Sequence, residues 1–64
     1  MRLKIFNASH IEIESFSISN DRGINDFNYV CKSLENELKK GMYNTVMLFD
    51  DNNKIVSSKT VVGK

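Results

Sequence analysis

The chain has 64 residues, with nine Lys and Arg against eight Asp and Glu, and a single cysteine. This length allows one domain over residues 1–64 with one small core, and the balanced charge excludes the strong positive field typical of nucleic-acid binders. One cysteine excludes an intrachain disulfide, and one Cys with one His cannot close a four-ligand zinc site. We therefore expect neither a metal nor a cofactor.

The N-terminal part of the chain predicts two strands joined by a tight turn. Residues Arg2–Phe6 alternate apolar and polar side chains as far as position 5, and a turn over Asn7–Ser9 leads to a second strand from about His10 to Ser19. In the second strand the apolar residues stand at positions 11 and 13 and then at 16 and 18. A β-bulge near Glu14–Ser15 would restore one apolar face, because a bulge shifts the alternation by one residue. The pattern favours this bulge; the alternative is a regular strand whose two halves make different contacts.

The middle of the chain predicts one amphipathic helix. Its apolar stripe, at i, i+3, i+4, i+7 and i+11, consists of Phe27, Val30, Cys31, Leu34 and Leu38. We expect Asn25 or Asp26 to cap the N-terminus, because their side chains accept backbone N–H bonds there. Lys39 and Lys40 should occupy the last turn, where the helix dipole favours cations, and Gly41 should follow as the left-handed residue.

Two further strands complete the predicted fold. They are Thr45–Phe49 and Lys54–Val62, separated by a turn over Asp50–Asn53 whose residue types favour turns. The order β-β-α-β-β predicts an α+β fold, in which a small antiparallel sheet has one helix packed on one face. Four strands make a sheet about 15–19 Å wide, whereas one helix is about 10–12 Å across, so the helix cannot cover the sheet completely.

The third strand is apolar on both of its faces. Its run Val-Met-Leu-Phe at positions 46–49 is typical of a strand that is buried on both sides. Something besides the helix should therefore cover the second face. The residues that we predict to contact a partner are Phe16, Ile18, Met47 and Phe49.

No arrangement of polar residues predicts catalysis. His10 stands at a predicted turn without an oriented nucleophile or acid, and Cys31 lies on the apolar stripe, where a thiol is expected to be buried and unreactive. Asp50–Asn53 lack the alternating acids, the glycine and the distant Glu of a calcium loop. Glu12 and Glu14 fit a solvated strand face, or charges that block pairing at a sheet edge. We therefore do not expect an enzyme.

These observations favour a small protein-interaction module, a homodimer that docks on a protein partner through an exposed sheet face or edge. Frequent Asn, Lys and Ile and the absence of Pro and Trp are typical of AT-rich genomes, which favours a regulator or inhibitor from a phage or mobile element. The alternative hypothesis is nucleic-acid binding, in which Lys54, Lys59 and Lys64 contact phosphates. The lone cysteine and the absence of a signal-like start favour the cytoplasm, and no apolar run approaches the length of a membrane span.

Overall fold

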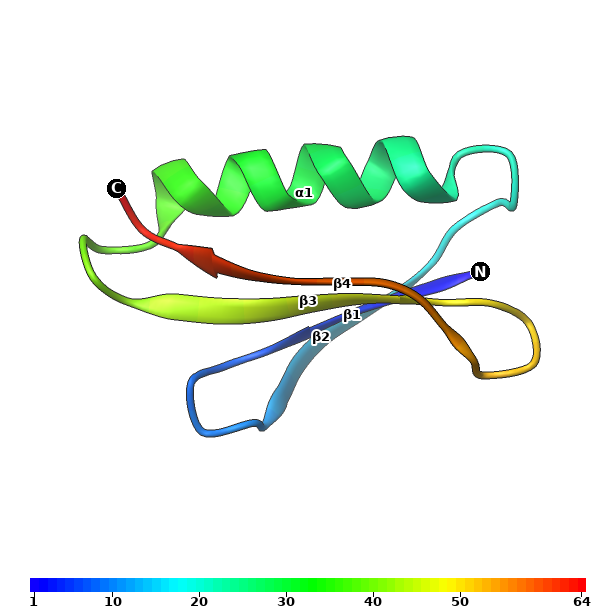
Figure 1. Ribbon diagram of the computed structural model, residues 1–64, viewed down its shortest axis with the longest axis horizontal. Helices are drawn as coiled ribbons and strands as arrows, with labels where there is room; N and C mark the ends of the chain where they lie inside the picture. The colour runs from blue at the N-terminus through cyan, green and yellow to red at the C-terminus, as the bar shows by residue number, and fades with distance from the viewer.

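A computed structural model describes all 64 residues, which form a four-stranded antiparallel sheet with one helix on one face (Figure 1). In chain order the elements are β1 (Arg2–Phe6), β2 (Glu12–Ser17), α1 (Gly23–Glu37), β3 (Tyr43–Phe49) and β4 (Ile55–Val62). The predicted α+β class and element order are confirmed. Across the sheet the strands lie in the order β2-β1-β3-β4, so β1 and β3 form the centre and β2 and β4 form the edges.

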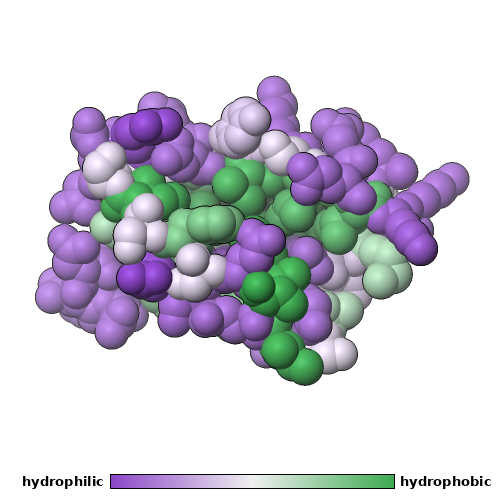
Figure 2. All heavy atoms as spheres, turned by 180° about the vertical axis from the view of Figure 1, so that it is seen from behind, coloured by the Kyte–Doolittle hydropathy of each residue, from purple (hydrophilic) through white to green (hydrophobic).

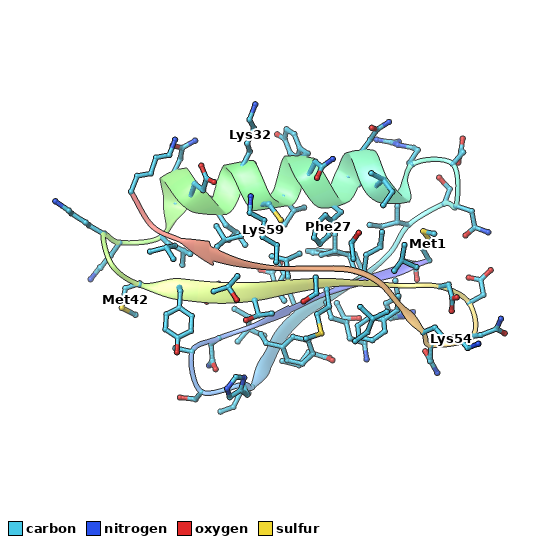
Figure 3. All side chains as sticks on the ribbon, in the orientation of Figure 1. Met1, Phe27, Lys32, Met42, Lys54 and Lys59 are labelled. Carbon is cyan, nitrogen blue, oxygen red and sulfur yellow. The ribbon has the colours of Figure 1, made fainter.

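The core lies between α1 and the two central strands. Leu3 of β1 pairs with Leu48 of β3, and Ile5 pairs with Val46, so that alternate residues of both strands face the helix. Phe27 of the predicted helical stripe points from α1 into this layer (Figure 3). The buried core consists of Leu3, Ile5, Phe27, Cys31, Val46, Leu48 and Val61. Val30, Leu34 and Leu38 are only partly buried and pack against its margin.

The helix begins earlier than the sequence predicts. Arg22 is the N-cap residue and makes no side-chain cap hydrogen bond. Asn25 and Asp26 therefore lie inside the first turn, and the prediction that one of them caps the helix is wrong. The preceding turn, in which the N–H of Arg22 donates to the carbonyl of Ser19 (3.1 Å), leads directly into the helix. The helix lacks the length and the apolar run that crossing a membrane requires.

The helix also ends earlier than predicted, and a residue that follows β4 donates a hydrogen bond to its last turn. The backbone N–H of Lys64 donates to the carbonyl of Glu35 (3.1 Å), which in a longer helix would accept from Lys39. Leu38 already has an extended backbone, with φ −70° and ψ 144°. Lys39 and Lys40 thus lie beyond the last helical turn, contrary to prediction. Gly41 does adopt the left-handed conformation (φ 85°), in the turn that leads to β3.

The two hairpins of the sheet use the same turn. Asn7 and Asp50 occupy equivalent positions, and the side-chain Oδ1 of each accepts backbone N–H groups from the residues two and four positions further on, at 2.8–3.0 Å. The residues three positions further on, His10 and Asn53, have φ of 63° and 62°. An Asn or Asp side chain that bonds nearby backbone in this way favours the turn, so each hairpin is defined locally.

A β-bulge follows each of these turns. The pairing of β2 with β1 skips Ile13, and the pairing of β4 with β3 skips Val56. The bulge predicted near Glu14–Ser15 is therefore present, but it lies at Ile13. Because the alternation shifts there, Phe16 pairs with Leu3 and lies on the helix side of the sheet.

Candidate interaction surfaces

The helix is not centred on the sheet. It packs against β1, β3 and β4, and makes no comparable contact with β2, all six residues of which are exposed. Two surfaces with apolar side chains result. One is the sheet face away from α1, called the open face below, and the other is a groove between α1 and β2, called the α1–β2 groove.

The open face carries the residues of β1 and β3 that alternate with the core. They are Arg2, Lys4, Phe6, Tyr43, Thr45, Met47 and Phe49. Val46 and Leu48 are fully buried on the helix side, so the prediction that Met47 and Phe49 lie on the opposite face is confirmed. That these two residues contact a partner stays a prediction.

Two basic side chains lie along the open face. The Nζ atom of Lys4 is 5.4 Å from the centroid of the Phe49 ring and 3.3 Å from Oε1 of Glu12. The guanidinium of Arg2 donates to the hydroxyls of two serines of β2, at 2.9 and 3.0 Å. Aliphatic stems of such side chains cover apolar surface while their charged ends stay in contact with water. Phe49 and Met47 are accordingly half-buried within one chain.

The remaining exposed apolar surface of the open face lies toward its two ends. Tyr43 and Val62, which pair across β3 and β4, are 41% and 51% exposed. Near the other end Ile55, which pairs with Phe49, is 57% exposed. These side chains have no cover comparable with that of Phe49, so they are the residues most available for association.

The α1–β2 groove consists of two adjoining hollows of about 310 and 340 Å³. Phe16, Tyr29 and Val30 line both hollows, which makes the groove continuous. Figure 2, seen from the β2 side, shows an apolar band between the helix and the sheet edge that is bordered by hydrophilic atoms. From β2 and the residue after it, the groove is lined by Ile13, Glu14, Phe16, Ser17 and Ile18.

The helical wall of the groove is a second stripe of α1, beside the core stripe. It consists of Asp26, Tyr29, Val30, Ser33, Leu34 and Glu37, at i, i+3, i+4, i+7, i+8 and i+11. Sequence reasoning missed Tyr29 and Glu37 as site residues. The helical spacing was visible, but only the strand order shows that this side of the helix lies beside an edge strand.

The charges of the groove have one sign. No Lys, Arg or His lines either hollow, whereas the carboxylates of Glu14, Asp26 and Glu37 do. Asp26 lies 3.5 Å from the guanidinium of Arg22. Neither Glu14 nor Glu37 has a cationic group within salt-bridge distance. The groove therefore combines apolar walls with negative charge at its margins.

The four predicted interaction residues are divided between these two surfaces. Met47 and Phe49 lie on the open face, whereas Phe16, which is 42% exposed, and Ile18 line the groove. They do not form one patch, because the bulge at Ile13 turns Phe16 to the helix side. The open face and the α1–β2 groove are therefore two separate candidate sites.

The three lysines of the nucleic-acid hypothesis also lie apart. Lys59 is on the helix side of β4 near Cys31 and Glu35, whereas Lys54 lies at the β3–β4 turn (Figure 3). Lys64 forms an ion pair with Glu35 at 3.3 Å. Since a strand of nucleic acid needs a continuous row of cations, this arrangement does not support the alternative hypothesis.

The polar residues considered for chemistry are placed as follows. His10 lies in the β1–β2 turn and borders a hollow of about 260 Å³ that Met47 also lines. Cys31 is 4% exposed, as predicted, and burial raises the pKa of its thiol. Glu12 is paired with Lys4. Nowhere do three His, Cys, Asp or Glu side chains gather in a way that would hold a metal ion.

Comparison of the chain with protein-family models, with curated proteins and with solved structures finds no significant match. Its function is therefore inferred from the two surfaces themselves.

Proposed function

We propose that this protein is a small interaction module that self-associates through the open face of its sheet and has no catalytic activity of its own. One observation carries the proposal: a single helix covers one face of a sheet whose central strands bear large apolar side chains on both faces. Apolar side chains gathered on one face of a small protein usually mark an association surface.

A second copy of the chain is the occupant that the chemistry of this face favours. Its few charged groups are engaged within the chain, Lys4 by Glu12 and Arg2 by serine hydroxyls. The contribution of β4 to the face is uncharged, with Ser58 and Thr60 beside the exposed Val62. A twofold interface places the same patch on both partners, and hydroxyls can both donate and accept across it.

The size of the face predicts a weak dimer. Four strands at 4.8 Å spacing and six residues of strand give a face of about 19 by 20 Å. Two such faces cover about 800 Å² in projection, which is below the range of stable specific interfaces. We therefore expect reversible association that depends on concentration in the micromolar to millimolar range.

Composition supports a biological setting for such a module. The Asn-, Lys- and Ile-rich sequence and the small size support a regulator or inhibitor encoded by a phage or mobile element. The single cysteine, which is buried and unpaired, supports a reducing cytoplasmic location.

Sedimentation velocity over a range of concentrations tests the self-association. The informative variant is Val62→Lys, which places a charge on the open face, and its matched control is Ile24→Lys in the first turn of α1. The two wild-type side chains are similarly exposed, at 51% and 47%. Wild type and Ile24→Lys should dimerise as concentration rises, while Val62→Lys should remain monomeric. A wild-type chain that stays monomeric at millimolar concentration would refute the proposal.

A further inference from the structure

We propose that the α1–β2 groove binds an extended basic segment of a partner protein, which adds to β2 as a fifth strand of the sheet. The site is separate from the open face, and the proposal does not depend on self-association there.

The first support is that β2 has a free edge. Only β1 pairs with it, so its outer side presents backbone N–H and C=O groups that an extended chain can pair with. An added strand would lie about 4.8 Å from β2. Its alternate side chains would point to the helix side of the sheet, where the exposed parts of Phe16 and Tyr29 lie. Pairing and apolar burial would thus occur together.

The second support is the length of the groove. Asp26 and Glu37 mark its two ends on α1 and are eleven residues apart, which is about 16 Å along a helix. Five residues of extended chain span about the same distance at 3.3 Å each. The strand β2 has six residues. A bound segment of about six residues therefore matches the length of the helical stripe and the length of β2.

The third support is charge complementarity, which also decides against a second copy of this chain. Three carboxylates and no cation line the groove; Asp26 is paired with Arg22 outside it, but neither Glu14 nor Glu37 has a cation within salt-bridge distance. If β2 of one copy paired with β2 of another, the Glu14 carboxylates of both copies would lie on one ribbon, and neither has a cation within salt-bridge distance, because Lys4 pairs with Glu12 instead. Like charges across paired strands are destabilising. A segment with apolar residues at alternate positions and Lys or Arg at its ends would instead pack against the apolar walls and place its cations near the carboxylates.

Two synthetic heptapeptides test the proposal on the wild-type chain. The first, KSISLSK, has basic ends and alternating apolar residues, and the second, ESISLSE, differs only in its acidic ends. Titration of ¹⁵N-labelled protein, followed by NMR, should show saturable shifts in β2 and along the groove side of α1. We expect the basic peptide to bind about tenfold more tightly, because two exposed ion pairs replace two repulsions.

Charge-reversal variants localise the effect. Glu14→Lys and Glu37→Lys should each weaken binding of KSISLSK by about threefold or more, whereas the control Asp21→Lys, which makes the same charge change outside the groove, should not. Equal affinity for the two peptides, shifts confined to the open face, or no saturable binding of either peptide would overturn the proposal. Sedimentation of the same samples reports self-association separately, so either proposal can fail while the other stands.

Discussion

Val61 and Val62 are neighbours on β4 with opposite environments, and their truncation tests the register of the sheet. Val61 pairs with Asn44 and is 1% exposed under α1, whereas Val62 pairs with Tyr43 and is 51% exposed on the open face. Because the residue type, the strand and the number of atoms removed are the same, the variants Val61→Ala and Val62→Ala differ only in which face they affect.

The difference in unfolding free energy follows from burial. Val61→Ala removes two buried methyl groups, which is a loss of about 1.6 kcal/mol in transfer free energy, and the remaining cavity adds about 1 kcal/mol. Val62→Ala removes groups that are half exposed, a loss of about 0.8 kcal/mol without a cavity. The loss in β-propensity is common to both variants. We therefore expect Val61→Ala to be less stable than Val62→Ala by about 2 kcal/mol.

Thermal melting followed by circular dichroism measures this difference. At this chain length 1 kcal/mol shifts Tm by about 4–8 °C, so Val61→Ala should melt about 8–16 °C below Val62→Ala. The melts should be made at a concentration at which the chain is monomeric, since dimer formation raises Tm by mass action. Equal melting points, or a lower one for Val62→Ala, would show that the register of β4 is shifted by one residue, and would refute the open face as described.

Two further predictions concern the thiol and the turns. Burial raises the pKa of Cys31, so the contribution of the protonated thiol to the unfolding free energy is fully present below the ordinary thiol pKa and is lost as the pH rises through the raised value. Cys31→Ala should therefore be less sensitive to alkaline pH than wild type in denaturant melts. The buried thiol of the folded chain should also react far more slowly with a disulfide reagent than the thiol of the denatured chain. Equal thiol reactivity in both states would contradict the buried position. Asn7→Ala and Asp50→Ala should each lower the unfolding free energy by about 0.5–1.5 kcal/mol, and urea melts that show a loss for only one of them would argue against equivalent turns.

Local patterns in the sequence predict the elements of this fold but not all of their ends. The stripe that includes Phe27 and Cys31 defines the helix, alternation defines β1, and the continuous apolar run at positions 46–49 defines β3. The end of the helix, however, depends on Lys64, whose N–H donates to the carbonyl of Glu35 from a distant part of the chain. The bulge could be predicted only approximately, near Glu14–Ser15, and it lies at Ile13, because a phase change in the alternation does not say which residue is skipped.

The candidate surfaces were partly predictable for a similar reason. Alternation separates Val46 and Leu48 from Met47 and Phe49, and the structure confirms that separation. The α1–β2 groove could not be predicted, because it depends on the strand order and on the position of α1 over β1, β3 and β4. Neither property follows from the local periodicity of a single sequence.

The joining of two locally defined hairpins through β1 and β3 has a consequence for folding kinetics. Each hairpin closes a short turn, and hairpins of this kind form in about 1–10 μs. The central pairing instead joins residues 39 to 47 positions apart, from Phe6 with Thr45 to Arg2 with Phe49. Closing a loop of that length is the largest entropic barrier in the sheet, and α1 lies within the loop. When α1 is formed, fewer flexible residues remain in the loop between β1 and β3, and the entropic cost of closing this loop falls. Early formation of α1 would therefore accelerate the pairing of β1 with β3.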